Sequence, residues 1–184
     1  MARWLLPTPD PQAAASLAAA LGISAPAARV LVRRSLASPD DARRFLHPSP
    51  DQLHDPLTLR DMPEAVARLK GAIYAHEKTL IYGDYDVDGT MSVVLLITAI
   101  RLCGGDVRYH VPHRLNEGYG MRPEVVEAAA AQGVTLIVSV DTGIRAAEVV
   151  RRAAELSIDV IVTDHHLPDA DLPAAVAEIG RAHV

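Results

Sequence analysis

Short apolar runs alternate with longer amphipathic segments through most of the chain after residue 62. The runs typical of strands are residues 79–83, 107–112, 135–140 and 159–163. The segments with apolar residues at helical spacing are residues 62–78, 90–105, 123–133 and 144–157. A strand followed by a helix, repeated along the chain, predicts an α/β fold: a parallel sheet with right-handed crossovers and helices on both faces.

The first part of the chain differs, because short helical segments are separated there by prolines. Helices are predicted over residues 11–22, 25–37 and 38–47. Ser38 is a suitable N-cap, since Pro39 follows at the first helical position and Asp40 places an acid in the first turn. Residues 48–63 are proline-rich and polar, which is typical of a connector. We therefore expect a small helical region and a connector over residues 1–62.

Composition limits the possible classes of function. Of the 184 residues, 49% are hydrophobic and 4% aromatic, so the core must be built from aliphatic side chains. The net charge of −5 gives no overall basic field, and any binding of nucleic acid must therefore be local. Cys103 is the sole cysteine, which favours an intracellular protein without disulfides. No apolar stretch approaches the roughly 20 residues that span a bilayer, so we expect a cytoplasmic protein without a membrane partner.

Acidic residues follow three of the predicted strands. The first strand runs into Asp84, Asp86 and Asp88, the third into Asp141, and the fourth into Asp164, His165 and His166. Because parallel strands end at the same edge of a sheet, ligands bind beyond their carboxyl ends, and these clusters should meet there. A single aspartate after a strand can equally be the N-cap of the next helix. Three strands with this ending favour a functional site.

Carboxylates that are crowded together repel one another, and a divalent cation relieves the repulsion. Along an extended segment alternate residues project to one side, so Asp86 and Asp88, with Asp84, can face one centre. Oxygen ligands with one or two imidazoles favour Mn²⁺ or Mg²⁺, and zinc is less favoured because no thiolate is near. Two such ions would suit the hydrolysis of a phosphoester.

Two other motifs share the letters GDYDVDGT of residues 83–90. An EF-hand loop begins in the same way but needs a glutamate at its twelfth position, where this chain has Leu95. The nucleophile motif of the haloacid-dehalogenase phosphatases matches Asp86 to Thr90. That family also requires a later lysine, and no lysine follows Thr79.

A third family accounts for all of these clusters. The segment VTDHH (162–166) resembles the motif that gives the DHH phosphoesterase superfamily its name, and SVDTG (139–143) resembles its second acidic motif. The segments GDYDVDG (83–89) and VPHRLNEGYG (111–120) are similar to those of the RecJ branch, the single-strand-specific 5′ to 3′ DNA exonucleases. The resemblance covers about residues 50–175.

This resemblance implies a two-metal hydrolase that uses no protein nucleophile. Asp86 and Asp88 match the metal ligands of the first motif, Asp141 the carboxylate that bridges both metals, and His165 a metal-binding imidazole. Many relatives have a further metal-binding histidine where this chain has Tyr82. We expect Tyr82 to be structural and Asp84 to supply the missing ligand.

Further residues receive roles in substrate binding from the same resemblance. It implies that His166 contacts the scissile phosphate and that Asp164 orients the histidines. Arg114 is either a clamp for a substrate phosphate or a solvated surface cation. The arginines at positions 29, 33, 34, 43 and 44 either line a path for single-stranded DNA or are the solvated faces of amphipathic helices.

The implied activity is a metal-dependent exonuclease on single-stranded DNA in recombination and repair, with a helicase and a single-strand-binding protein as candidate partners. Alternatives in the superfamily are a phosphodiesterase for nanoRNA or cyclic dinucleotides and a manganese pyrophosphatase. A non-catalytic DHH scaffold is a further alternative, although such proteins tend to lose ligand residues that this chain keeps.

The end of the chain suggests that the domain is truncated. The resemblance implies a further aspartate and a second domain after the DHH motif, whereas the chain stops 18 residues after His166. Its last residues, EIGRAHV, are also what a common sequencing adaptor would encode. We therefore expect an incomplete DHH domain over residues 63–177, a non-native tail over residues 178–184, and little hydrolysis by this fragment.

Overall fold

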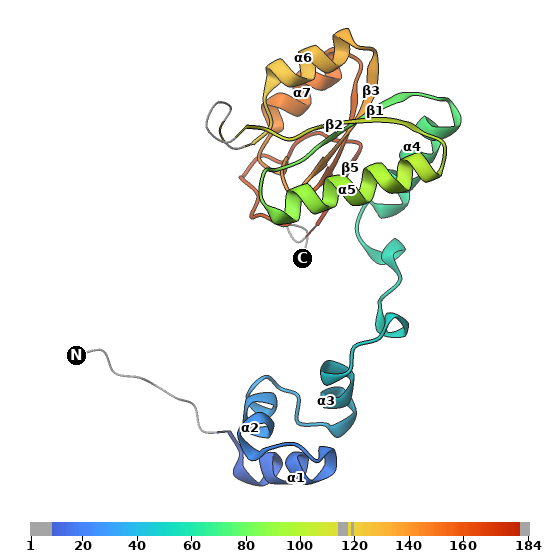
Figure 1. The fold of residues 1–184 in the computed structure, drawn as a ribbon. Helices are drawn as coiled ribbons and strands as arrows, with labels where there is room; N and C mark the ends of the chain where they lie inside the picture. Colours follow the sequence, from blue (N-terminus) through green and yellow to red (C-terminus); the bar gives the residue numbers. More distant parts are fainter. Residues whose placement is uncertain (1–8, 114–117, 119, 181–184) are drawn as a thin grey trace, which may run out of the picture. The chain divides into compact units, whose positions relative to one another are not determined.

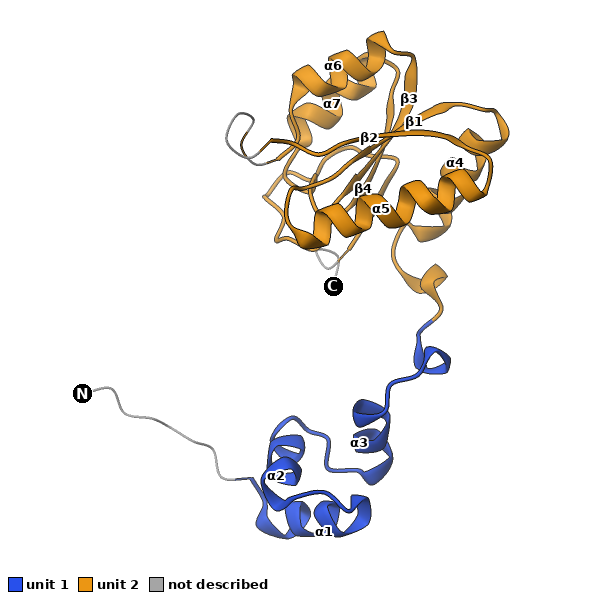
Figure 2. Ribbon diagram, in the orientation of Figure 1, with its two compact units in different colours: residues 1–54 blue, residues 55–184 orange. Residues whose placement is uncertain are grey.

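The structure, a computed structural model, describes residues 9–113, 118 and 120–180. It divides the chain into two compact units, residues 1–54 and 55–184 (Figure 2). This boundary lies within the proline-rich connector that the sequence predicts. Among the described residues no single helix is long and apolar enough to cross a membrane; only α1 (Pro11–Leu21) with α2 (Ala25–Arg33), bent by 119° at their junction, reach that length and composition together.

The described residues of the first unit, from residue 9 on, form three short helices and one 3₁₀ turn. They are α1 (Pro11–Leu21), α2 (Ala25–Arg33), α3 (Pro39–Leu46) and η1 (Pro50–Gln52). Asp10, Ser24 and Ser38 cap the helices with their side chains, as the sequence predicts for Ser38. The helices enclose a small core of alanine and leucine, formed by Ala14, Leu17, Ala28, Leu31 and Ala42.

The second unit is built on a five-stranded parallel sheet in the order β2-β1-β3-β4-β5 (Figure 1). The strands are β1 (Lys78–Tyr82), β2 (Asp106–His110), β3 (Val134–Val140), β4 (Asp159–Thr163) and β5 (Ala177–Ile179). The helices are α4 (Met62–Tyr74), α5 (Val87–Leu102), α6 (Pro123–Ala131) and α7 (Ala147–Glu155), preceded by the 3₁₀ turn η2 (Pro56–Thr58). The predicted parallel α/β fold is confirmed.

Each face of the sheet carries its own hydrophobic core. On one face Leu80 and Tyr82 pack with α6 and α7, whereas Ile81 points to the other face and packs with α4 and α5. This alternation follows from the two-residue period of a strand, and it explains why the central strands are apolar throughout. The two layers of helices hold the sheet rigid, so that the loops at its carboxyl edge start from fixed positions.

The fifth strand was not predicted, because its apolar run is short and lies at the boundary of the suspected tail. Glu178 and Ile179 pair with β4, and the Asp164 amide donates to the Ile179 carbonyl (3.0 Å). The Glu178 amide in turn donates to Asp61 Oδ2 (3.1 Å), at the start of α4. Residues 181–184 lie outside the described part of the chain, and the non-native origin of residues 178–184 stays a prediction.

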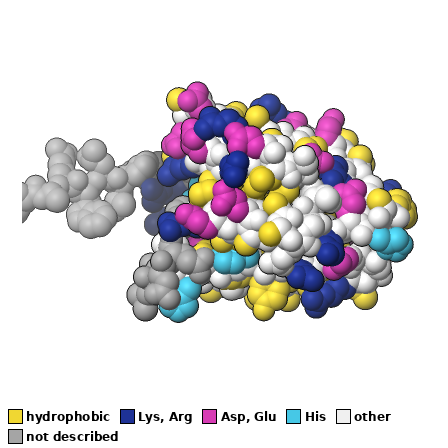
Figure 3. Space-filling view, turned by 90° about the horizontal axis from the view of Figure 1, so that it is seen from above, with side chains coloured by type: hydrophobic (Ala, Val, Ile, Leu, Met, Phe, Trp, Pro, Cys, Tyr) yellow, Lys and Arg dark blue, Asp and Glu magenta, His cyan; other side chains and the backbone are white. Residues whose placement is uncertain are grey.

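The surface of the second unit carries charges of both signs. On the face in Figure 3, basic and acidic side chains lie next to one another. Arg152, for example, pairs with Glu127 and with Glu155, each at 2.9 Å. Exposed pairs of this kind contribute little to stability, but they neutralise the surface over α6 and α7.

Candidate metal centre

The loop after β1 brings two aspartates to the carboxyl edge of the sheet. Asp84 is buried, and Asp86 is the N-cap of α5, where its Oδ1 accepts a hydrogen bond from the Gly89 amide (3.0 Å). The first turn of α5 packs so closely against this loop that a Cβ at Gly89 would lie 2.6 Å from the Asp84 carbonyl oxygen. Only glycine permits this close approach.

Asp88 is placed differently from the sequence expectation. It lies in the first turn of α5 and is exposed, so the expected extended alternation of Asp84, Asp86 and Asp88 is wrong for Asp88. The capping hydrogen bond explains the difference, since it starts the helix one residue after Asp86. Asp88 still lines a cavity together with Asp141 and His165, and its role as a metal ligand stays a prediction.

The loop after β3 places Asp141 in an uncommon backbone conformation. Asp141 has φ 60° and is 7% exposed, and its amide donates to the Thr163 carbonyl (2.9 Å). Gly143 follows with φ 114°, and a Cβ there would lie 2.5 Å from Ser139 Oγ. This tight turn continues to Ala146, so α7 begins at Ala147 and not at the predicted residue 144. Non-glycine residues with positive φ are concentrated at functional sites.

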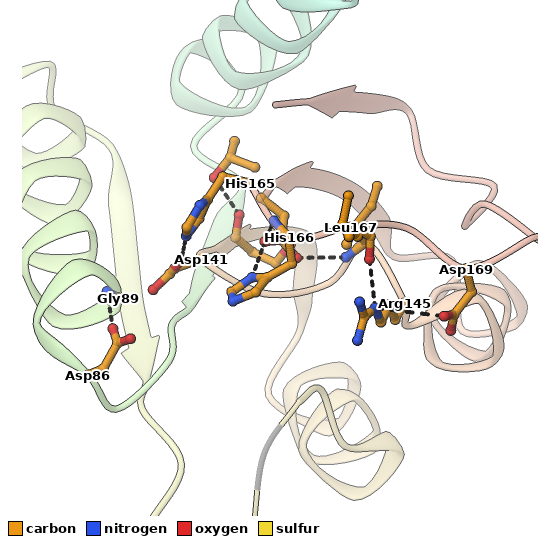
Figure 4. A network of polar contacts seen from close by, with 12 residues as sticks. Asp86, Gly89, Asp141, Arg145, His165, His166, Leu167 and Asp169 are labelled. Carbon is orange, nitrogen blue, oxygen red and sulfur yellow. Dashed lines mark hydrogen bonds and ion pairs between the residues drawn. The ribbon is translucent and has the colours of Figure 1, made fainter. Parts of the chain in front are cut away.

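The loop after β4 carries the Asp-His-His motif, in which the Asp164 carboxylate accepts hydrogen bonds from two loops. Its Oδ2 accepts a hydrogen bond from the Ile144 amide (3.0 Å), and its Oδ1 accepts one from the His166 amide (3.1 Å). The same Oδ1 lies 2.7 Å from His166 Nδ1 (Figure 4). Asp164 thereby contacts both the loop after β3 and the ring of His166. These contacts hold His166 and do not extend to the ring of His165, so the proposed action of Asp164 on His165 stays a prediction.

Potential ligand atoms from all three loops converge at this edge. Two groups form, each with ligand atoms within 4.8 Å of one another: Asp84, Asp86 and Asp141 in one, and Asp141, His165 and His166 in the other. Asp141 belongs to both groups, and the bridging role that the resemblance implies for it stays a prediction. Figure 4 shows Asp141 between Asp86 and the two histidines.

The Asp141 carboxylate is buried without hydrogen-bond donors from the described residues. His165 Nε2 lies 3.0 Å from Asp141 Oδ1, which suits an ion pair when the imidazole is protonated, although the two do not align as a hydrogen bond. Buried carboxylate oxygens without donors are costly. A cation at this point would satisfy both oxygens, so these residues fit Mn²⁺ or Mg²⁺.

The electrostatics of the two adjacent aspartates differ. Burial raises the pKa of Asp141, and the neighbouring Asp86 raises it further. The hydrogen bond from the Gly89 amide lowers the pKa of Asp86. Without a cation, Asp86 therefore keeps its charge more readily than Asp141 does. Binding of a divalent cation would favour the ionised form of both carboxylates.

Two further residues from the sequence analysis have different outcomes. Tyr82 is fully buried, donates a hydrogen bond to the Gly120 carbonyl (3.2 Å) and packs its ring against His110 at 5.0 Å between centroids. These contacts agree with a structural role for Tyr82. Arg114 lies outside the described residues, so its proposed contact with a substrate phosphate stays a prediction.

Arg145 is a residue of the site that sequence reasoning missed. Its Nε donates to the Leu167 carbonyl (2.7 Å) and lies 3.7 Å from Asp169 Oδ1, so it ties the loop after β3 to the loop that carries the histidines (Figure 4). Its sequence context gave no signal, because position 145 fell inside a segment predicted to be helical.

Cavities lie on both sides of the converging side chains. The larger, of about 520 Å³, lies beside α5 and is lined by Asp88, Met91, Ser92, Leu95, Asp141, Thr163, Asp164, His165, Ile179 and Gly180. The second, of about 310 Å³, lies beside the start of α7 and is lined in part by Gly143, Arg145 and His166. A substrate can therefore approach the centre from an open groove.

Comparisons with known proteins agree with this geometry. Residues 78–181 match the family described as DHH family, N-terminal domain. The single-stranded-DNA-specific exonuclease RecJ of Bacillus subtilis is 39% identical over 171 residues, which are 93% of this chain and 22% of that protein. The exonuclease of the same name from Escherichia coli is 45% identical over 122 residues, which are 66% of this chain and 21% of that protein. The chain thus spans about a fifth of the length of these relatives.

Solved structures show the same similarity. Exonuclease RecJ bound to manganese matches with a TM-score of 0.64 and 34% identity, over 70% of this chain and 33% of that one. RecJ from Thermus thermophilus in complex with Mn²⁺ matches with a TM-score of 0.78 and 27% identity, over 99% of this chain and 25% of that one. Both similar structures contain manganese.

Proposed function

We propose a function from the premise that this chain belongs to the DHH family. The chain provides the metal-binding part of a phosphodiesterase that removes nucleotides from the 5′ end of single-stranded DNA, in recombination and repair. Its relatives are named single-stranded-DNA-specific exonucleases, and they are about five times as long as this chain. The activity therefore belongs to the whole protein, and this chain alone is expected to hydrolyse little.

One observation carries the proposal: Asp141, buried without hydrogen-bond donors from the described residues, belongs to both groups of potential ligands. A carboxylate shared by two groups of ligands is what a pair of divalent ions requires. We assign Asp84, Asp86 and Asp141 to one ion and Asp141 with His165 to the other. Asp88 borders the same groove and is proposed as a further ligand.

The remaining residues of the site are proposed to bind the substrate or to orient another side chain. His166, positioned by Asp164, is proposed to contact the scissile phosphate, for which imidazole N–H groups are suitable donors. Mn²⁺ or Mg²⁺, when bound, supplies an activated water and neutralises the charge of the phosphate. The metals that the resemblance implies would activate a water for the attack, so a side-chain nucleophile such as Ser92, which lines the groove beside Asp141, is not required. We therefore assign no protein nucleophile.

Partners and location are also proposals. Single-stranded DNA is produced by helicases and covered by single-strand-binding proteins, so both are candidate partners of the whole protein. A DNA-processing role agrees with a place in the cytoplasm. Nothing in the geometry of the metal centre depends on these proposals.

The proposal is tested first by metal binding to this chain. Titration with Mn²⁺, followed by the electron paramagnetic resonance of free Mn²⁺, is expected to show binding that Asp141→Asn weakens at least tenfold, because it removes the shared carboxylate. Asp106→Asn is the matched control, since Asp106 begins β2 at the opposite edge of the sheet. Equal binding by the two variants would contradict the proposed site.

The substrate is tested with the complete gene product in Mn²⁺. End-labelled single-stranded DNA, short RNA and pyrophosphate are compared at equal concentration, and release of mononucleotides from the 5′ end of the DNA is expected to be fastest. A preference for short RNA or pyrophosphate would instead assign the protein to another branch of the superfamily. Metal binding without any hydrolysis would support a scaffold.

A further inference from the structure

The two units of the chain differ in the sign of their charge. Residues 1–54 contain six arginines and four aspartates, a net charge of +2, whereas residues 55–184 contain 12 basic and 19 acidic residues, a net charge of −7. The overall charge of −5 hides this division. A small positively charged unit in an otherwise acidic protein is suited to binding an anionic partner.

The positive charge of the first unit is concentrated on the outer face of α2. Arg29, Val30, Arg33 and Arg34 are all exposed, while Ala28 and Leu31 on the other side are buried. Because residues three and four apart are neighbours on a helix, the exposed four form one continuous patch. Val30, Arg33 and Arg34 also line a shallow cavity of about 230 Å³.

No acid on α2 balances these arginines. The helix has no aspartate or glutamate, and no ion pair links Arg29, Arg33 or Arg34 to a described residue. Arg33 lies in the last turn, where a cation interacts favourably with the helix dipole, but Arg29 lies one turn earlier and gains nothing there. Like charges four residues apart destabilise a helix slightly. An anionic partner would reverse that effect.

An exposed aromatic ring lies beside the patch. Phe45, the single phenylalanine of the chain, is 54% exposed on α3, and the Arg34 guanidinium lies 6.0 Å from its ring centroid. Arg43 on the same helix is engaged by Asp40 at 2.9 Å and is therefore set apart from the patch. Guanidinium groups next to an exposed ring are the elements from which proteins build platforms for stacked bases.

We propose that Arg29, Arg33, Arg34 and Phe45 of the first unit form an auxiliary binding site for single-stranded nucleic acid, built from residues other than those of the metal centre. The arginines contact successive phosphates, and one base stacks on Phe45. The identity of the ligand rests on the proposed function, because single-stranded DNA is the substrate proposed there. An acidic peptide shares the negative charge but offers no planar ring for Phe45, so nucleic acid is favoured.

The test measures the affinity of the whole chain for a fluorescent thymidine oligonucleotide by anisotropy in EDTA, which removes the divalent cations. The double variant Arg33→Gln/Arg34→Gln is expected to bind at least tenfold more weakly. Its slope of log affinity against log salt should fall by about 1.4, because two phosphate contacts to a single strand are lost. Phe45→Leu is expected to weaken binding about tenfold without changing that slope.

Arg151→Gln/Arg152→Gln is the matched control. It removes the same charge from α7, where both arginines pair with glutamates, and its affinity should equal that of the unchanged chain. Arg33→Lys/Arg34→Lys should keep most of the affinity, and circular dichroism should show that all variants are folded.

The outcomes are distinct from those of the metal experiment. Failure of the unchanged chain to bind the oligonucleotide in EDTA, or an equal loss in the α7 variant, overturns the auxiliary site and leaves the metal centre unaffected. Competition by poly-glutamate at lower concentration than by the oligonucleotide would assign the patch to an acidic protein and also overturn it.

Discussion

His165 Nε2 lies 3.0 Å from Asp141 Oδ1, although the two residues follow different strands. The contact places an imidazole and a buried carboxylate at the point where two groups of potential ligands meet. Both oxygens of that carboxylate lack a hydrogen-bond donor from the described residues. The loops at this edge are therefore arranged for a charge that the protein itself does not supply.

Asp141→Asn should make the chain more stable without metal, by about 1 kcal/mol, because it removes a buried charge that repels Asp86. Asparagine tolerates the positive φ of this position nearly as well as aspartate. Since the folded pKa of Asp141 is raised, its ionisation destabilises the fold as the pH rises above about 4. Thermal unfolding in EDTA from pH 4 to 8 should show this loss for the unchanged chain only. A variant that is less stable than the parent at pH 7 would contradict the interpretation.

Gly89→Ala should disrupt the centre, since its Cβ would lie 2.6 Å from the Asp84 backbone. We expect a loss of about 2–3 kcal/mol in the free energy of unfolding and at least tenfold weaker Mn²⁺ binding. Gly71→Ala is the matched control, because Gly71 lies within α4 and a Cβ there meets nothing within 4 Å. That change should stabilise by about 0.5–1 kcal/mol. Urea denaturation compares the two, and equal effects would contradict the proposed close contact.

Glu77→Gln should weaken the attachment of α4 to the sheet. Arg68 Nη2 lies 2.7 Å from Glu77 Oε2, Thr135 Oγ1 donates to the same oxygen at 2.6 Å, and these hydrogen bonds lower the pKa of Glu77, with that from Arg68 the stronger. Because the pKa of Glu77 is lower in the folded chain than in the unfolded chain, where it is about 4.3, the ionised carboxylate stabilises the fold above that pH. This stabilisation is lost as the pH falls through the pKa of the folded chain.

For this glutamate we therefore expect a loss of about 1 kcal/mol at pH 7 that becomes smaller as the pH falls below about 4. Urea denaturation at both pH values measures it. Glu148→Gln removes an exposed partner of Arg151 and should change stability by less than about 0.5 kcal/mol at either pH. A loss for Glu77→Gln that persists unchanged at pH 3 would show that its charge is not involved.

Arg145→Gln should loosen the loop that carries the histidines. The loss of the hydrogen bond to the Leu167 carbonyl is expected to speed hydrogen exchange of the amides of residues 165–169 several-fold, as local opening becomes easier. Mn²⁺ affinity should fall several-fold as well, because the imidazoles are less well positioned. Arg145→Lys should retain part of the protection from hydrogen exchange and part of the Mn²⁺ affinity. Exchange that is unchanged in the glutamine variant would mean that Asp164 alone holds the loop.

The sequence by itself determined the architecture of the second unit. The short apolar runs of β1 and β3 and the helical spacing of α5 and α6 depend on neighbouring residues, so they can be found without coordinates. The direction of parallel strands then placed Asp141 and His165 at one edge. Their roles come from the resemblance to DHH motifs and stay predictions, while the family match confirms the resemblance itself.

Only the tertiary structure decided how the site is assembled. The capping hydrogen bond from Gly89 to Asp86 moved Asp88 into a helix, and the tight turn after Asp141 delayed the start of α7. The contact of Arg145 with Leu167 joins two loops that are distant in sequence, and the exposure of Phe45 beside Arg34 depends on how two helices pack. Periodicity in the sequence indicates which face of a helix or strand is buried. It does not indicate which loops approach one another, because that depends on how segments distant in sequence pack together.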